Sequence, residues 1–420
     1  MVKSITIPWS AWYGKEEYVL GFPDTWNVQL FGMQDAKEIT DLEELKAALE
    51  NPLGTPPIHE IARGKKNAVI VVEDISRPTR TGPICEMVLK ELNKAGISNE
   101  NITLIAALGA HRPMTRDDFI KKVGAKVVES VNIENHHPYE NLVFLGNSSL
   151  GTPIYLNKTY HEAEVKIAVG TVIPHALAGF GGGAKIVLPG ICGIQTLEAN
   201  HQAAVKGIGV GLGIITELRK DIEEVCGRVG LDFSINVVST MKRGIAEVFA
   251  GHYIKAHRKA VELAKRIYST ELPKLSRDER LDVGFFNLYP EDTELSQAVK
   301  GFPLFFSAQE LFKREAAVIF LTAASEGRGY HSLIGETGGR LYQNWGEHLL
   351  FQALSDNPFG IFSPSLSKAD IFHFYPKRTI FHKNFNKMIQ ELEEICGPSP
   401  RAGIFPTSIQ LTQKEKGEKK

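Results

Sequence analysis

The chain has 420 residues, a formal net charge of −1 at pH 7, 43% hydrophobic residues and 23% charged residues. This length exceeds one ordinary core and predicts two domains, and the balanced charge argues against nucleic acid or an anionic membrane as main partner. No run of eighteen apolar residues and no signal sequence is recognisable, so we expect a cytoplasmic protein acting on a small molecule. The four cysteines lack paired short spacings and predict free thiols.

The first part of the chain alternates predicted strands and helices. Uninterrupted apolar runs rich in β-branched residues predict buried strands at residues 67–72, 103–108 and 165–169. Edge strands are expected at residues 4–8 and 17–21, and helices at residues 41–50, at residues 82–92 and after the N-cap residue Thr115. This alternation predicts an α/β fold with a mainly parallel sheet, in which ligands gather at the carboxyl ends of the strands.

A second region follows a long amphipathic helix predicted at residues 251–272. Pro273 and the charged residues after it indicate a domain boundary. Beyond the boundary, strands are predicted at residues 281–286, 316–321, 360–363 and 371–374, and helices at residues 340–353 and 385–396. We therefore predict a larger N-terminal domain of residues 1–272, a smaller C-terminal α/β domain of residues 273–408 and a solvated tail of residues 409–420.

Residues 173–201 combine two histidines, a run of glycines and one lysine. Gly181, Gly182 and Gly183 permit positive φ and a close approach of the backbone to a ligand, which predicts a bulky, phosphorylated ligand. Lys185 follows among apolar residues, and burial would disfavour its ammonium form and favour the nucleophilic amine. The loop does not match the phosphate loop of nucleotide hydrolases, because Ala184 stands where that motif has glycine and an isoleucine follows the lysine.

Polar residues follow the predicted strands at the ligand-binding edge. Asp74 and Arg77 follow the first strand, His111 the second and His175 the third. Two neutral imidazoles that face one substrate carbon from opposite sides can exchange acid and base roles near neutral pH, which suits the inversion of a stereocentre. The pair at residues 136–137 precedes a proline and is interpreted as turn residues.

Five motifs occur in order: DISRP from Asp74, GAHRPM around His111, PHALAGFGGGAKIVLPG around Lys185, ANH ending at His201, and QAVKG from Gln297. Together they resemble the nickel-dependent lactate racemase family of 2-hydroxyacid racemases and epimerases, over about residues 60–305. The resemblance implies a nickel-pincer nucleotide, a modified pyridinium mononucleotide that supplies two sulfur atoms and a ring carbon to nickel. It also implies covalent attachment of this cofactor at Lys185 and coordination of the metal by His201, and imidazole and sulfur donors suit nickel.

The resemblance further implies how the reaction proceeds. His111 and His175 would act as alternating base and acid at the substrate hydroxyl, while hydride moves from Cα to the cofactor ring. Arg77 and Lys300 would hold the carboxylate or polarise the hydroxyl oxygen. Asp74 and Gln297, the latter three residues before Lys300, would position the cofactor or catalytic groups. Because Lys300 falls in the predicted second domain, the active site is expected in the cleft between the domains.

The resemblance implies a small 2-hydroxyacid as substrate and cofactor-biosynthesis enzymes as partners. Ala184 departs from the family pattern, in which arginine commonly precedes the attached lysine, so the identity of the 2-hydroxyacid stays open. The alternative function is a non-catalytic protein that binds or stores the nickel nucleotide, for which Lys185 and His201 alone would suffice. A nicotinamide-dependent dehydrogenase is disfavoured because no GxGxxG motif follows the first strand.

Overall fold

The computed structural model describes residues 2–203, 213–331, 354 and 357–413. Residues 36–267 form one compact unit, here called the middle unit, and residues 1–35 together with 268–420 form a second, here called the terminal unit. Both are α/β units with parallel sheets. Within the described ranges, no helix is both long enough and apolar enough to cross a bilayer.

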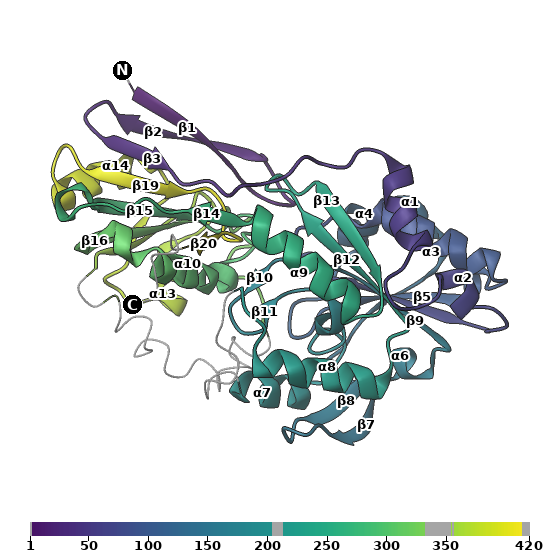
Figure 1. The fold of residues 1–420 in the computed structure, drawn as a ribbon. Helices are drawn as coiled ribbons and strands as arrows, with labels where there is room; N and C mark the ends of the chain where they lie inside the picture. The colour runs from purple at the N-terminus through teal and green to yellow at the C-terminus, as the bar shows by residue number, and fades with distance from the viewer. Residues whose placement is uncertain (1, 204–212, 332–353, 355–356, 414–420) are drawn as a thin grey trace, which may run out of the picture. The chain divides into compact units, whose positions relative to one another are not determined.

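The middle unit is built on a six-stranded sheet in the order β13-β12-β9-β4-β5-β6. Strands β5, β9, β12 and β13 of this sheet are labelled in Figure 1. Neighbouring strands are parallel except β12 and β13, which are antiparallel. The strands are β4 (Ala68–Glu73), β5 (Ile102–Ala107), β6 (Asn132–Asn135), β9 (Val165–Thr171), β12 (Phe233–Ser239) and β13 (Ile245–Gly251). The predicted mainly parallel sheet and its three buried strands are therefore confirmed.

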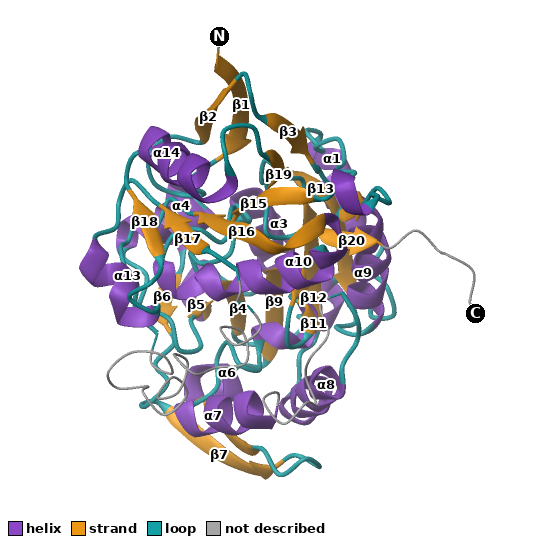
Figure 2. Cartoon of the chain, turned by 90° about the vertical axis from the view of Figure 1, so that its left-hand side faces the viewer, coloured by secondary structure: helices purple, strands orange, loops and turns teal. Residues whose placement is uncertain are grey.

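Helices and short hairpins surround this sheet (Figure 2). The helices are α1 (Leu42–Glu50), α2 (Ile58–Ile61), α3 (Gly82–Lys94), α4 (Arg116–Val123), α5 (Ala125–Ser130), α6 (Lys158–Glu162), α7 (Ile194–Ala203), α8 (Glu217–Val229) and α9 (Lys255–Ile267), with 3-10 turns η1 (Asn99–Asn101) and η2 (Gly183–Ile186). Two antiparallel pairs complete the unit: β7 (Leu142–Asn147) with β8 (Pro153–Asn157), and β10 (Pro174–His175) with β11 (Gly179–Phe180).

Strand β4 shows why the sheet is buried on both faces. Ile70 and Val72 pack in one core cluster with Val88 of α3, whereas Val69 and Val71 alternate with them and are also fully buried. Nearby, α4 begins at a capping box, in which the Thr115 side chain accepts from the Asp118 backbone and the Asp118 side chain accepts from the Thr115 backbone. The predicted N-cap at Thr115 is confirmed.

The terminal unit contains a six-stranded parallel sheet in the order β18-β17-β16-β15-β19-β3. Its strands are β3 (Asn27–Leu30), β15 (Leu281–Asn287), β16 (Phe312–Leu321), β17 (Phe359–Phe362), β18 (Ile380–His382) and β19 (Arg401–Phe405). Two further pairs are β1 (Val2–Pro8) with β2 (Glu17–Pro23), and β14 (Ser269–Glu271) with β20 (Leu411–Gln413). Among the described residues of this unit, the helices are α10 (Gly301–Ser307), α13 (Lys368–Phe374) and α14 (Phe385–Cys396), with 3-10 turns η4 (Arg277–Glu279), η5 (Leu295–Lys300) and η6 (Gln309–Leu311).

The core of the terminal unit is rich in phenylalanine. Phe286 of β15 stacks on Phe405 of β19 with ring centroids 4.8 Å apart, in the same cluster as Phe302 and Phe305 of α10. Phe285, the neighbour of Phe286, points into a second cluster that includes the β1–β2 hairpin and α14. The sheet is therefore covered by a separate apolar cluster on each side.

Several predicted boundaries differ from the structure. The first 35 residues belong with the terminal unit, not with a domain of residues 1–272, because β3 pairs with β19 and the β1–β2 hairpin packs in the same core as β15. The helix predicted over residues 251–272 is shorter, because β13 extends to Gly251 and β14 begins at Ser269.

Two predictions in the last third of the chain are wrong. Residues 371–374 are the end of helix α13 and not a strand, since a capping box between Ser367 and Asp370 starts the helix. The predicted tail begins too early, because Ile409 and Gln410 are buried and β20 pairs with β14. The helix predicted over residues 340–353 and the last part of the tail, residues 414–420, lie outside the described residues.

Candidate active site

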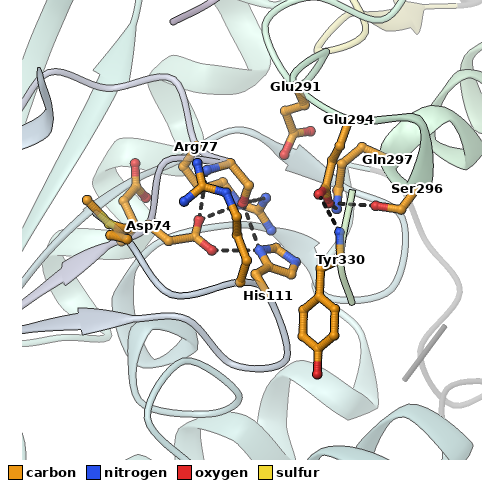
Figure 3. A network of polar contacts seen from close by, with 12 residues as sticks. Asp74, Arg77, His111, Glu291, Glu294, Ser296, Gln297 and Tyr330 are labelled. Atoms are coloured by element: carbon orange, nitrogen blue, oxygen red, sulfur yellow. Dashed lines mark hydrogen bonds and ion pairs between the residues drawn. The ribbon is translucent and has the colours of Figure 1, made fainter. Parts of the chain in front are cut away.

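Asp74 and His111 form a hydrogen-bonded pair at the carboxyl edge of the middle-unit sheet (Figure 3). They follow β4 and β5, which are adjacent parallel strands, so the chain leaves both strands at the same edge. His111 Nδ1 lies 2.6 Å from Asp74 Oδ2. Burial raises the pKa of Asp74, but the charge and hydrogen bond of His111, with Arg77 and Ser76, lower that pKa below its ordinary value. Asp74 is therefore an ionised acceptor, and His111 Nδ1 carries the proton.

Ser76 joins this pair to Arg77. The Ser76 hydroxyl donates to Asp74 Oδ1 at 2.5 Å and lies 2.9 Å from His111 Nδ1, and Arg77 Nη1 donates to Ser76 Oγ at 3.0 Å (Figure 3). The Ser76 backbone N–H also donates to Asp74 Oδ1. In a neutral His111 the unprotonated nitrogen is consequently Nε2, which is the nitrogen suited to accept a proton.

His175 is held in the opposite way. It ends β10, and its Nδ1 accepts the backbone N–H groups of Leu177 and Ala178, each at 3.2 Å. A ring nitrogen that accepts cannot carry the proton, so neutral His175 is protonated at Nε2. The two imidazoles that the sequence singled out therefore present complementary nitrogens, an acceptor on His111 and a donor on His175.

The glycine-rich loop between β11 and η2 packs tightly against the rest of the middle unit. Gly182 and Gly183 have φ of +72° and +56°, as predicted, whereas the prediction is wrong for Gly181, whose φ is not positive. A Cβ on Gly181 would lie 2.8 Å from the Thr171 carbonyl oxygen, and one on Gly183 would lie 2.8 Å from Arg219 Nη2. The amides of Gly181 and Gly183 already donate to the Ile173 carbonyl and to Asn236. These glycines are thus required for packing within the protein, whatever ligand the loop holds.

Lys185 lies in η2, half-buried between fully buried Ala184 and nearly buried Ile186. The turn that carries Lys185 packs against β4, β9 and β12 of the sheet. The position of the backbone at Lys185 is therefore set by packing against the sheet.

His201 lies near the end of α7 and has the hydrogen bonding expected of a histidine that could bind a metal ion. Its Nδ1 donates to the Leu197 carbonyl at 2.8 Å, which leaves the lone pair on Nε2. Burial lowers its pKa to about 4, against the effect of the Leu197 hydrogen bond and with help from the charges of Lys185 and His111. A neutral imidazole with a fixed tautomer is the form that binds a metal ion. The part of the chain that the structure describes holds no group of three or more His, Cys, Asp or Glu side chains arranged to bind a metal.

A buried ion pair supports the backbone beside Asp74. Lys122 of α4 is fully buried, with its Nζ 3.2 Å from Glu73 Oε1, and it donates to the Arg77 carbonyl at 3.0 Å. Glu73 Oε2 accepts the Thr171 backbone N–H at 2.8 Å. This pair links α4 to the ends of β4 and β9, the strands that lead to Asp74 and His175. The sequence analysis did not identify it, since neither residue belongs to a recognisable motif.

In the terminal unit, Gln297 of η5 lies beside Glu294 and Ser296 (Figure 3). Lys300 is the last residue of the same turn. Gln297 donates to Glu294 Oε1 at 2.9 Å, and the same carboxylate accepts the Ser296 hydroxyl and the Tyr330 backbone N–H. Lys300 Nζ lies 2.5 Å from Glu291 Oε1. The two residues are three positions apart as noted in the sequence, but each is held by a different acid. Glu291 and Glu294 follow β15, and their place at a strand end was the signal that could have identified them.

The histidine pair interpreted as turn residues separates into two environments. His137 is exposed, whereas His136 is buried, with its Nε2 2.9 Å from the Cys192 carbonyl oxygen. Burial lowers the pKa of His136 to about 4. All four cysteines are free thiols, as predicted, and three of them are buried.

Comparison with known proteins agrees with the motifs. The lactate racemase N-terminal domain model matches residues 13–211. The chain is 30% identical over 329 residues to a lactate racemase of Thermoanaerobacterium thermosaccharolyticum. The aligned region covers 76% of this chain and 74% of that protein. The chain is also 30% identical over 305 residues to a lactate racemase of Lactiplantibacillus plantarum, with 70% of each chain covered.

Solved structures share the fold. The lactate racemase apoprotein of T. thermosaccharolyticum superposes with a TM-score of 0.77 at 24% identity, over 98% of this chain and 100% of that one. A protein of Thermotoga maritima matches with a TM-score of 0.64 at 17% identity, over 90% and 99% of the two chains. These relatives and the family model identify the chain as an isomerase of the racemase class. More specifically, it belongs to the lactate racemase family.

Proposed function

We propose that the chain racemises or epimerises a 2-hydroxyacid, with His111 and His175 as the acid and base and a nickel-pincer nucleotide as cofactor. The observation that carries this proposal is the opposite hydrogen bonding of the two imidazoles. A carboxylate fixes the proton of His111 on Nδ1, whereas two backbone amides fix that of His175 on Nε2. One neutral imidazole is therefore ready to take the hydroxyl proton and the other to give one, as a reversible inversion requires.

The cofactor would be held by Lys185 and His201. The half-buried amine of Lys185 would attach it covalently, and the lone pair of His201 Nε2 would bind the nickel. When bound, this group supplies the ring carbon that accepts the hydride of the substrate Cα and returns it. Gly181, Gly182 and Gly183 would shape the loop beside it. The proposed roles are consistent with the state of the two side chains, because one is a half-buried primary amine and the other a neutral imidazole.

The remaining residues would bind and orient the substrate. Arg77 carries a planar fork of donors suited to a carboxylate, and Ser76 holds one edge of that fork beside His111. Asp74 would orient His111 and stabilise its protonated form. For Lys300 and Gln297, the proposal of a substrate contact rests on the QAVKG motif and on the family resemblance. Cofactor-biosynthesis enzymes are the proposed partners that supply the nucleotide.

The experiment is a substrate panel with cofactor-loaded protein. The chain is expressed with and without cofactor-biosynthesis enzymes, and single enantiomers of several 2-hydroxyacids are followed by optical rotation. We expect interconversion of at least one acid by the loaded protein and none by the unloaded protein. A loaded protein that converts no acid would instead support the storage function, and stoichiometric NADH formation with added NAD would support a dehydrogenase.

Intact mass measures the cofactor separately. The loaded wild type should be heavier than the chain alone, and Lys185→Ala should have the mass of the unmodified chain. Lys220→Ala is the matched control, because Lys220 is exposed on α8 and pairs only with Glu217 at the surface in the described residues. Retention of the added mass by Lys185→Ala would contradict the attachment site.

A further inference from the structure

The backbone just before Lys185 is held by buried side chains from three other elements. Arg219 of α8 donates through Nη1 to the Phe180 carbonyl at 3.2 Å and through Nη2 to the Gly182 carbonyl at 3.0 Å. His257 of α9 donates through Nε2 to the Gly181 carbonyl at 2.8 Å. Three successive carbonyl groups of the loop thus have side-chain donors.

Asn236 of β12 completes the arrangement by accepting the Gly183 backbone N–H at 2.8 Å. Arg219, His257 and Asn236 are each fully buried. A buried carbonyl or amide without a partner is unfavourable, so this network stabilises the observed conformation of the loop.

Further contacts fix two of these side chains, Arg219 and His257. Glu223 accepts from Arg219 Nε at 2.8 Å and from Arg258 Nη2 at 2.7 Å, and Arg258 Nη1 donates to His257 Nδ1 at 2.9 Å. Since His257 Nδ1 accepts, its proton must be on Nε2, where it bonds to the Gly181 carbonyl. The charges of Arg219 and Arg258, added to burial, lower the pKa of His257 well below its ordinary value and keep the ring neutral.

Glycine is required on the facing side. A Cβ on Gly183 would lie 2.8 Å from Arg219 Nη2 and 3.0 Å from the Tyr253 carbonyl oxygen, and Gly183 also has a φ of +56°. The loop and the side chains beneath it therefore fit together only when both are intact. Lys185 follows Gly183 by two residues, in the turn η2 that packs against α8.

We propose that Arg219, His257 and Asn236 position Lys185. These three side chains fix the conformation of the loop, and so hold the lysine amine in one place before any cofactor binds. The proposal deepens the attachment role of Lys185 and rests on the proposed function in that respect. A preformed loop removes the entropy cost of ordering the chain when the cofactor binds. Arg219 acts through the backbone and has no assigned contact with substrate or cofactor.

The test compares Arg219→Met and Arg219→Lys with Arg228→Met in the unloaded protein. Arg228 lies on the same helix, is half-exposed and bonds to the Asn147 carbonyl and to Glu224, so it is the matched control. The first readout is hydrogen exchange of the peptide that covers residues 180–186. We expect exchange about tenfold faster in Arg219→Met, an intermediate rate in Arg219→Lys, which can reach one carbonyl only, and no change in Arg228→Met.

The second readout is specific to the lysine. Competitive acetylation with trace acetic anhydride compares the reactivity of Lys185 with that of exposed Lys220, and Arg219→Met should change this ratio several-fold while thermal unfolding still shows a folded chain. A folded Arg219→Met with wild-type exchange and a wild-type ratio would overturn the proposal. If Arg219→Met does not fold, Gly183→Ala disturbs the same contact from the loop side and must give both changes.

Cofactor loading distinguishes the positioning role of Arg219 from the proposed attachment at Lys185. In cells that make the cofactor, Arg219→Met should carry less covalently bound cofactor by intact mass than Arg228→Met. A wild type that never gains mass would end the proposed function but leave the exchange and acetylation results standing. Normal loading of Arg219→Met despite a loosened loop would overturn the positioning role alone.

Discussion

The loop after β5 and the loop after β9 each present one imidazole, but they hold it by different means. His111 donates from Nδ1 to an ionised side chain, Asp74, whereas His175 accepts at Nδ1 from the backbone of its own hairpin. A carboxylate stabilises a positive charge on the ring, and a backbone N–H that donates to Nδ1 disfavours protonation at that nitrogen. Two histidines therefore carry their protons on different ring nitrogens, because the hydrogen-bond partner of Nδ1 differs.

The largest expected effect comes from removing either imidazole. His111→Ala and His175→Ala should each lower kcat for racemisation by about 10²–10⁴, because each removes one proton-transfer group. Both variants should keep the covalently bound cofactor by intact mass. His137→Ala, which removes an exposed imidazole, should behave as the wild type. Near-normal racemisation by either variant would remove that histidine from the mechanism.

A smaller effect is expected from changing the partner of His111. Asp74→Asn should lower kcat by about 10²-fold with the fold intact, since an amide neither fixes the proton on Nδ1 nor stabilises a charged ring. The His175 side offers no equivalent substitution, because its partners are backbone amides. The pH–rate profile provides the check: the limb that reports His111 should move in Asp74→Asn. An unchanged kcat and profile would show that the pair at 2.6 Å has no role in proton transfer.

The smallest expected effect is a change in the pH dependence of the free energy of unfolding. It comes from a third imidazole, that of buried His136. Its folded pKa of about 4 lies below that of the unfolded chain, so below about pH 6.5 the unfolded chain binds a proton that the folded chain does not. The contribution of His136 to the free energy of unfolding is therefore complete above about pH 6.5. It declines by about 1.4 kcal/mol per pH unit as the pH falls toward 4.

Urea unfolding between pH 7.5 and 5 measures this decline. His136→Asn should be less stable than the wild type at pH 7.5, because the bond to the Cys192 carbonyl changes, but its stability should fall less steeply with acidification. His137→Asn is the adjacent exposed control and should keep the wild-type slope. Equal slopes in all three proteins would contradict the low pKa of His136.

Local sequence patterns predicted much of the fold. The apolar run at residues 67–72 became β4, and the predicted helix over residues 385–396 matches α14 at both ends. Apolar runs and caps act over a few residues, so they can be recognised without the rest of the chain. The short segment of residues 371–374 is apolar enough for either state, and the capping box at Ser367 decided in favour of a helix.

Local sequence patterns likewise identified some residues of the candidate site and missed others. His111, His175, Lys185 and His201 were singled out by motif and by their place after strands or in the glycine run. Arg219 and Lys122 were not singled out, because each lies on an amphipathic helix, where a charged residue is expected to be exposed to solvent. Their complete burial depends on which carbonyl groups and carboxylates the fold brings to them.

The sequence by itself determined the family, the parallel α/β architecture and the residue types available for proton transfer, because these depend on short motifs and on hydrophobic periodicity. Only the tertiary structure decided that the first strands belong with the last ones, that His111 and His175 carry their protons on different nitrogens, and that a buried arginine holds the loop before Lys185. The physical reason is that pairing, burial and tautomer are set by partners distant in the chain, and no local pattern records which partners will meet.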